Sequence, residues 1–264
     1  MAKLKDEINK KDEKKVNPKS PFKDIALFET EIKDFINKFK AKVVTHSKRV
    51  SDYFEMSCFN DIVRFYEFNN YTITVENLQK NEYKYKCSTS GIQTNFSHFQ
   101  ASINYNDEVF AYEIHHNLAV QSCHDSEIFT TPDISIIKAK TAQTILGYYE
   151  TNTRFSFVEN KNLMSFCECK QFPPFPELLF NFIGVINELR LDIIFNKFEE
   201  LVPIHIAPSL MVSGKPNRQT SRIKNSLENR FCVNIIYDLF YSRSITFSKN
   251  NIKNLRTAGK LSIT

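Results

Sequence analysis

Two segments near the N-terminus repeat apolar residues every three or four positions, the spacing of an amphipathic helix. The first predicts a helix over residues 28–44, and the second predicts a helix over residues 47–68. Ser47 or Ser51 is suited to the N-cap of the second helix, and Asn69 and Asn70 are suited to its end. Glu55 lies on or beside the apolar stripe of this helix, which is an unusual place for a carboxylate.

The pattern then changes to the alternation of apolar and polar residues that is typical of strands. Strands are predicted at 71–75, 83–88, 99–105 and 109–120, and Asn106-Asp107 supplies a turn between the last two. Neighbouring strands joined by short turns favour an antiparallel meander with one solvated face.

The second half of the chain alternates predicted strands and helices. Strands are predicted at 128–137 and 154–169, with a helical or loop segment at 139–151 between them. Pro176 is suited to the first position of a largely buried helix over 177–201. A strand at 204–212, a helix at 220–231 and a strand at 233–239 follow. This order predicts one α/β domain with a mixed sheet flanked by helices.

Composition sets the limits of that domain. Residues 1–20 mix charges without a core-forming pattern and are expected to be a disordered or mobile segment. The domain is predicted to span residues 21–243. Residues 244–264 are expected to form a basic tail. The charged N-terminus is no signal peptide, and cysteines without a paired motif fit buried thiols, so a cytoplasmic protein is expected.

The longest apolar stretch, 178–195, is too polar for a membrane span. The net charge of +5 is compatible with nucleic acid, and no glycine-rich phosphate loop occurs.

Acidic residues stand at defined places on two of the predicted strands. Pro132-Asp133 opens one apolar run, and Glu168-Cys169-Lys170 ends another. Two carboxylates, with a backbone carbonyl such as that of Cys169, are suitable ligands for a hard divalent cation. Lys170 shares a strand face with Glu168 and can orient water or offset phosphate charge. The alternative without a catalytic role is a surface ion pair at the strand ends.

These residues resemble the motif of the PD-(D/E)xK nuclease superfamily, which has the restriction-endonuclease-like fold. Gln171 after the lysine occurs in several branches of that superfamily, and Glu55 stands where members often carry a further acidic residue on a helix. The resemblance implies a Mg²⁺-dependent enzyme, with Mn²⁺ as a substitute, that cuts DNA in a prokaryotic restriction or antiphage defence system. Cleavage of both DNA strands would suit a homodimer, because two strands need two sites, and an activating partner protein of a defence system is the other expected partner. The gap between Asp133 and Glu168 is long, so residues 139–153 must loop out of the core.

Further polar residues leave other possibilities open. Glu113 and His115 share one strand face, where they flank the metal site, contact substrate or face solvent. A non-catalytic module on the same fold that binds nucleic acid or a partner protein is the main alternative to an enzyme. Histidines and cysteines also allow a zinc-dependent hydrolase or a Cys–His nucleophile, although their spacing fits no common zinc motif: His115, His116, Cys123, His124, Cys167 and Cys169. Basic residues are predicted to contact nucleic acid: Lys138, Arg154, Lys215, Arg218 and Arg222.

Overall fold

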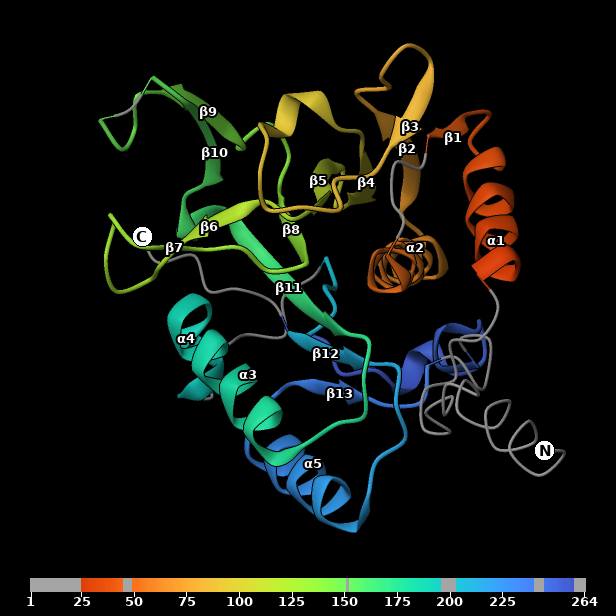
Figure 1. Ribbon diagram of the computed structural model, residues 1–264, viewed down its shortest axis with the longest axis vertical. Coiled ribbons are helices and arrows are strands. Elements are labelled where there is room, and N and C mark those ends of the chain that lie inside the picture. Colours follow the sequence, from red (N-terminus) through yellow and green to blue (C-terminus); the bar gives the residue numbers. More distant parts are fainter. Residues whose placement is uncertain (1–24, 45–48, 151, 196–202, 240–244, 259–264) are drawn as a thin grey trace, which may run out of the picture.

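The fold is described from a computed structural model (Figure 1). The structure describes residues 25–44, 49–150, 152–195, 203–239 and 245–258. The predicted N-terminal charged segment and the predicted cap at Ser47 lie outside these residues.

A seven-stranded mixed sheet forms the centre of the protein, as the sequence predicts. Its strand order is β13-β12-β11-β8-β5-β4-β2, and the strands β11, β12 and β13 run parallel while the other neighbours are antiparallel. The strands are β2 (Thr72–Glu76), β4 (His98–Tyr105), β5 (Glu108–His116), β8 (Ile134–Lys138), β11 (Leu163–Lys170), β12 (Ser209–Val212) and β13 (Asn234–Ile236).

Helices cover both faces of this sheet (Figure 1). On one face α2 (Val50–Phe68) packs against β2, β4 and β11, with α1 (Ile25–Asn37) beside it. On the other face lie α3 (Pro176–Leu189), α4 (Leu191–Ile194) and α5 (Arg218–Arg230). Alternate residues of β11 enter the two cores, with Cys167 in the first and Phe166 in the second. Both faces of the central strands are therefore buried, which fixes their register.

Two predicted helices are shorter than expected. The first ends at Asn37, because Lys40 has a left-handed backbone (φ 58°) and the chain continues as β1 (Lys42–Val44). The helix predicted over 177–201 does begin at Pro176, but it breaks at Arg190. The buried Arg190 side chain bonds to Asp192 and to the carbonyl of Met164, which ties this break to β11.

Several predicted strands are divided, and their parts form a second sheet. Its order is β7-β6-β10-β9, with β6 (Ala119–Gln121), β7 (Phe129–Thr130), β9 (Gln143–Leu146) and β10 (Arg154–Val158). The prediction of a helix or loop over 139–151 is wrong for residues 143–146, where β9 forms a hairpin with β10, whereas 139–142 and 147–150 are turns or loop. This hairpin leaves the central sheet, so β8 and β11 are neighbours, as the proposed site requires.

Shorter elements complete the fold. The strand predicted at 83–88 is β3 (Glu82–Lys84), which pairs with β1 outside the central sheet. Four short 3₁₀ helices occur in the described chain: η1 (Gln93–Asn95), η2 (Asn160–Asn162), η3 (Ile245–Phe247) and η4 (Ile252–Asn254). The described part of the predicted basic tail packs on the domain, because Phe247, Ile252 and Ala258 are buried. No helix in the described ranges has the length and apolar content needed to cross a membrane.

Candidate functional site

Asp133 lies immediately before β8, next to the C-terminal end of β11. The antiparallel register pairs Cys167 with Ile134, which brings Asp133 beside the end of β11. The backbone N–H of Cys169 donates to Asp133 Oδ2 over 2.6 Å. The predicted role of Cys169 was a carbonyl ligand, but its contact with Asp133 is made by its amide. The thiol of Cys169 is buried on the α2 side of the sheet.

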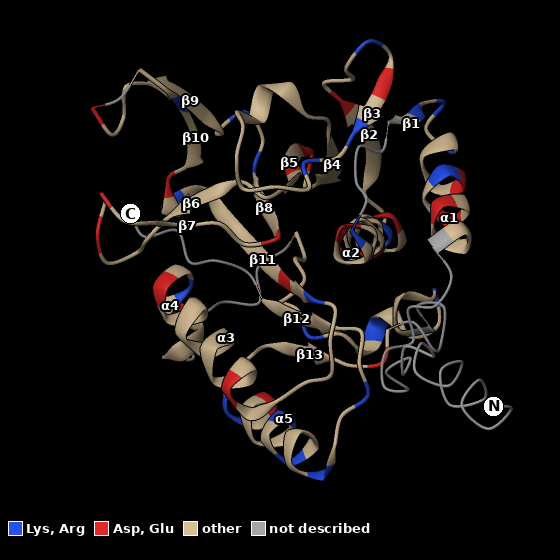
Figure 2. Ribbon diagram, in the orientation of Figure 1, with Lys and Arg blue, Asp and Glu red and all other residues tan. Residues whose placement is uncertain are grey.

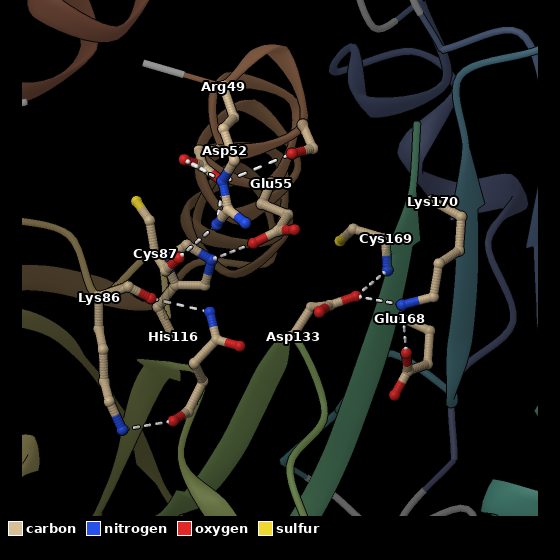
Figure 3. A network of polar contacts seen from close by, with 12 residues as sticks. Arg49, Asp52, Glu55, Lys86, Cys87, His116, Asp133, Glu168, Cys169 and Lys170 are labelled. Carbon is tan, nitrogen blue, oxygen red and sulfur yellow. Dashed lines mark hydrogen bonds and ion pairs between the residues drawn. The ribbon is translucent and has the colours of Figure 1, made fainter. Parts of the chain in front are cut away.

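Lys170 joins Asp133 to Glu168. Its Nζ donates to Asp133 Oδ2 over 2.9 Å and to Glu168 Oε2 over 2.7 Å (Figure 3). Glu168 and Lys170 are two residues apart on β11 and share a face, as the strand period predicts. The structure therefore brings the three motif residues together, with one ammonium group between two carboxylates.

Burial and charge shift the ionisation of this group. Burial raises the pKa of Glu168 to about 7, and the negative charges of Asp133 and Glu55 add to the rise, while Lys170 opposes it. Burial acts to lower the pKa of Lys170, but the charges of Glu168 and Asp133 outweigh it and hold that pKa above its ordinary value. The lysine is charged at neutral pH, and Glu168 is close to its titration point.

Glu55 reaches this region from α2, as the resemblance implies. Its side chain is partly exposed, and Oε2 lies 3.5 Å from Nε2 of the buried His116 (Figure 3). The charge of Glu55 acts on both Glu168 and Cys169. The charge of Glu55 thus reaches Glu168, but the carboxylate oxygens of Glu55, Asp133 and Glu168 are not all within 4.8 Å of one another in the described structure.

Lys86 and Asn117 hold the segment that carries Asp133, and sequence reasoning missed both. The N–H of Asn117 donates to the carbonyl of Asp133, and the Asn117 carbonyl accepts from the buried Lys86 Nζ at 2.7 Å. Asn117 has φ 51°, which ends β5 at this point. Lys86 alternates with tyrosines along the predicted strand, a pattern that predicts a solvated lysine side chain. The sequence therefore gave no indication that Lys86 is buried.

The predicted basic residues are divided between two places. Lys215, Arg218 and Arg222 are exposed on the loop after β12 and on α5. The register Lys170↔Val212 brings this loop to the same end of the sheet as Lys170. Lys138 is at the opposite end of β8 from Asp133, and Arg154 starts β10 in the second sheet. Gln171 directly follows β11 and is half-buried.

Gly214 locks that loop against the segment after Lys170. A side chain at this position would meet Pro173 Cα at 2.4 Å, so only glycine permits the close approach. The contact draws the loop that carries Lys215 toward Phe172 and Pro173. The charge distribution in Figure 2 places blue segments on this loop and along α5.

Glu113 and His115 form a separate cluster with His98. Both are buried, so the solvent-facing alternative is wrong for them. Among the described residues, His98, Glu113 and His115 are the one set of three or more His, Cys, Asp or Glu side chains with ligand atoms within 4.8 Å of one another. The zinc set considered from the sequence is not assembled: Cys123 is exposed, and Cys167 and Cys169 are buried on β11.

Adjacent histidines of β5 belong to different environments. His116 packs against Phe59 of α2 and contacts Glu55, whereas His115 contacts Glu113 on the other face of the sheet. The His116–Glu55 contact and the cluster of His98, Glu113 and His115 are therefore separated by the sheet itself.

Comparisons with family models, with curated proteins and with solved structures find no match, so similarity assigns the chain to no family.

Proposed function

We propose that this chain is a Mg²⁺-dependent nuclease that hydrolyses phosphodiester bonds of DNA, with Mn²⁺ able to replace Mg²⁺. The observation that carries the proposal is the contact of Asp133 and Glu168, from adjacent strands, with the same nitrogen of Lys170. Two carboxylates within reach of one cationic group form a pair that a divalent cation can bridge.

The donor set fits a hard cation. Asp133 and Glu168 would hold it, with Glu55 as a third carboxylate. The bound ion would activate water and offset charge on the phosphate. The Cys169 thiol, between Glu168 and Lys170 on β11, is turned toward α2 and away from the face of those two side chains.

Lys170 is the residue suited to act on the substrate. Its side chain is 29% exposed, which leaves room for the ammonium group to turn from the carboxylates toward a phosphate. There it would offset the negative charge that grows on the phosphate oxygens. Water attacks phosphorus and releases a proton, the bond to the leaving oxygen breaks, and that oxygen takes up the proton.

The substrate and the setting rest on the family resemblance and on charge. Lys215, Arg218 and Arg222 supply exposed cationic groups at the same end of the sheet as Lys170. A restriction or antiphage defence system, a homodimer or an activating partner, the restriction-endonuclease-like fold and a cytoplasmic location all belong to this proposal.

A non-catalytic binding module is the second candidate. One observation favours it: the Lys170 ammonium already satisfies both carboxylates, so the group is complete without a metal ion. A module of this kind would bind nucleic acid or a partner protein and leave DNA uncut.

A plasmid-cleavage assay separates the two candidates. We expect the wild type to cut plasmid DNA with Mg²⁺ or Mn²⁺, and D133N and K170A to be inactive at equal protein concentration. Lys161→Ala is a matched control, because it removes another lysine–glutamate ion pair at an exposed position. Equal cleavage by K170A would overturn the assignment, and DNA binding without cleavage by the wild type would favour the module.

A further inference from the structure

His98, Glu113 and His115 lie side by side on the face of the central sheet opposite α2. The β4–β5 register pairs Phe99 with Ile114, so His98 is beside His115, and Glu113 follows on the same face. The two imidazole rings stack with centroids 4.4 Å apart and an interplanar angle of 27°. Both rings direct Nε2 to the Glu113 carboxylate, at 2.9 Å from His115 and 3.9 Å from His98.

We propose that these three side chains form a second metal site, specific for Zn²⁺ or a similar transition metal, independent of the carboxylate pair. Two imidazoles and a carboxylate are a preferred donor set for Zn²⁺ and a poor one for Mg²⁺. Ligand atoms of a tetrahedral zinc site with bonds of about 2.0–2.1 Å lie roughly 3.3 Å apart. The observed separations of 2.9 and 3.9 Å lie on either side of that value.

The surroundings already orient the ligands from outside, as at established metal sites. Glu113 Oε1 accepts from the backbone N–H of Lys140 over 2.8 Å. The buried Gln93 lies 3.1 Å from His115 Nδ1 and sets the angle of that ring. His98 has a side-chain exposure of 16%, so the cluster is open to solvent on its side. Three protein ligands leave a fourth position for water or another small ligand.

Gln93 determines which nitrogen of His115 carries the proton. Lys86 Nζ donates to Gln93 Oε1 over 3.2 Å, which turns the Gln93 amide nitrogen toward His115 Nδ1. His115 then carries its proton on Nε2 and donates it to Glu113. A metal ion on Nε2 takes the place of that proton, which moves to Nδ1, and the Gln93 amide must turn its oxygen to accept it.

Because the Gln93 amide must turn before metal binds, a variant that removes this step should bind metal more tightly than the wild type. Gln93→Glu replaces the amide with two acceptor oxygens, one for His115 Nδ1–H and one for Lys86. The metal-binding tautomer of His115 is then favoured before metal arrives. We expect Q93E to bind Zn²⁺ about tenfold more tightly than the wild type, in the range of second-shell effects. A cluster with only a structural role gives no reason for such a gain.

The experiment uses the full chain stripped of metal by a chelator and titrated with ZnCl₂ by calorimetry, with elemental analysis of the bound metal. Cobalt absorption in the visible range reports the coordination geometry independently. We expect one Zn²⁺ per chain in the wild type and in D133N/E168Q, which alters the other site. H98N and E113Q should lose at least a hundredfold in affinity. His124→Asn is the matched control, because His124 is an exposed histidine away from the cluster.

Circular dichroism and thermal unfolding establish that each variant is folded before its affinity is compared. Zinc binding that is unchanged in H98N and E113Q would overturn the site. Absence of Zn²⁺ binding by the wild type, together with absence in Q93E, would overturn it as well. DNA cleavage is not a readout here, so failure of this proposal is distinct from failure of the nuclease proposal.

Discussion

Glu168 and Glu113 are both largely buried on the central sheet, yet their pKa values move in opposite directions. Burial raises the pKa of Glu168 to about 7, and neighbouring negative charge adds to this. Burial also acts to raise the pKa of Glu113, but the hydrogen bond and charge of His115 and the N–H of Lys140 outweigh it and hold that pKa below its ordinary value.

The difference lies in the partners rather than in the depth of burial. Glu113 accepts hydrogen bonds from His115 and from the backbone N–H of Lys140. These two donors stabilise the negative charge of its carboxylate. Glu168 has Lys170 as its donor and faces the charges of Asp133 and Glu55. A carboxylate that faces two further negative charges, with one ammonium group to offset them, gains most from a bound cation. The Glu168 group is therefore suited to a hard, highly charged ion, and the Glu113 group to a metal that replaces a proton on histidine.

The largest expected effect comes from Lys170→Met. It removes the cation between Asp133 and Glu168, so activity and metal affinity should change in opposite directions. We expect DNA cleavage to fall at least about a hundredfold, the size of effect typical of a lost transition-state contact. Binding of Mn²⁺, measured by calorimetry, should tighten because the lysine no longer competes for the carboxylates. Weaker Mn²⁺ binding would contradict the view of Lys170 as a competitor for that position.

Isosteric neutralisation of the two glutamates should change stability in opposite directions. Glu113→Gln removes a charge-assisted hydrogen bond and should lower the free energy of unfolding by about 1–3 kcal/mol at pH 8. Glu168→Gln relieves repulsion among buried carboxylates and should raise it by about 1–2 kcal/mol. Urea unfolding in chelator, with both variants beside the wild type, measures the contrast. A loss of stability in both variants would mean that the partners do not distinguish the two sites.

The pH dependence of the Glu168→Gln effect follows from its raised pKa. Glu168 binds its proton more tightly in the folded chain than its ordinary value of 4.5 allows. The stability from that proton is fully present below pH 4.5 and is lost as pH rises through 7. The gain from E168Q should therefore be large at pH 8 and vanish near pH 4.5. A gain that is constant across this range would assign it to packing instead of ionisation.

The smallest effects concern the basic residues, some of which lie at the Lys170 end of the central sheet and others away from it. K215A/R218A should weaken binding to duplex DNA and reduce the slope of log affinity against log salt by about 2, roughly one for each lost phosphate contact. K138A/R154A removes the same charge at positions away from Lys170 and should leave the slope nearly unchanged. Fluorescence anisotropy over a range of salt concentrations, in Ca²⁺, measures both. Equal slopes would place the DNA surface elsewhere.

Local sequence predicted the parts of the fold that depend on neighbouring residues. The periodicity of α2, Pro176 at the start of α3 and the turn at Asn106-Asp107 all depend on residues close in the chain. The adjacency of β8 and β11, and with it the meeting of Asp133, Glu168 and Lys170, was predicted from the motif together with a looped-out segment. The structure has that adjacency.

The second sheet could not be predicted in the same way. The prediction carried one strand across Asn117 and another across the polar residues 159–162, because strand-like segments stand on both sides of each. A left-handed residue at Asn117 and a 3₁₀ turn at Asn160–Asn162 divide them. The histidine cluster was missed as a group because His98 and His115 meet through strand pairing, and no sequence spacing encodes that contact.

The paired histidines of β5 make this strand intolerant of slippage. Side chains of a strand alternate between faces, so a shift of one residue would exchange His115 with His116. His115 and Glu113 would both turn toward the aromatic core beside Phe59, and His116 would leave Glu55 for the face that carries His98. One misaligned strand would thus disturb the His116–Glu55 contact and the cluster of His98, Glu113 and His115 at once, although these lie on opposite faces. Because the two consecutive histidines have different partners, only one register of β5 satisfies both. The left-handed backbone of Asn117 ends β5 and thereby fixes that register.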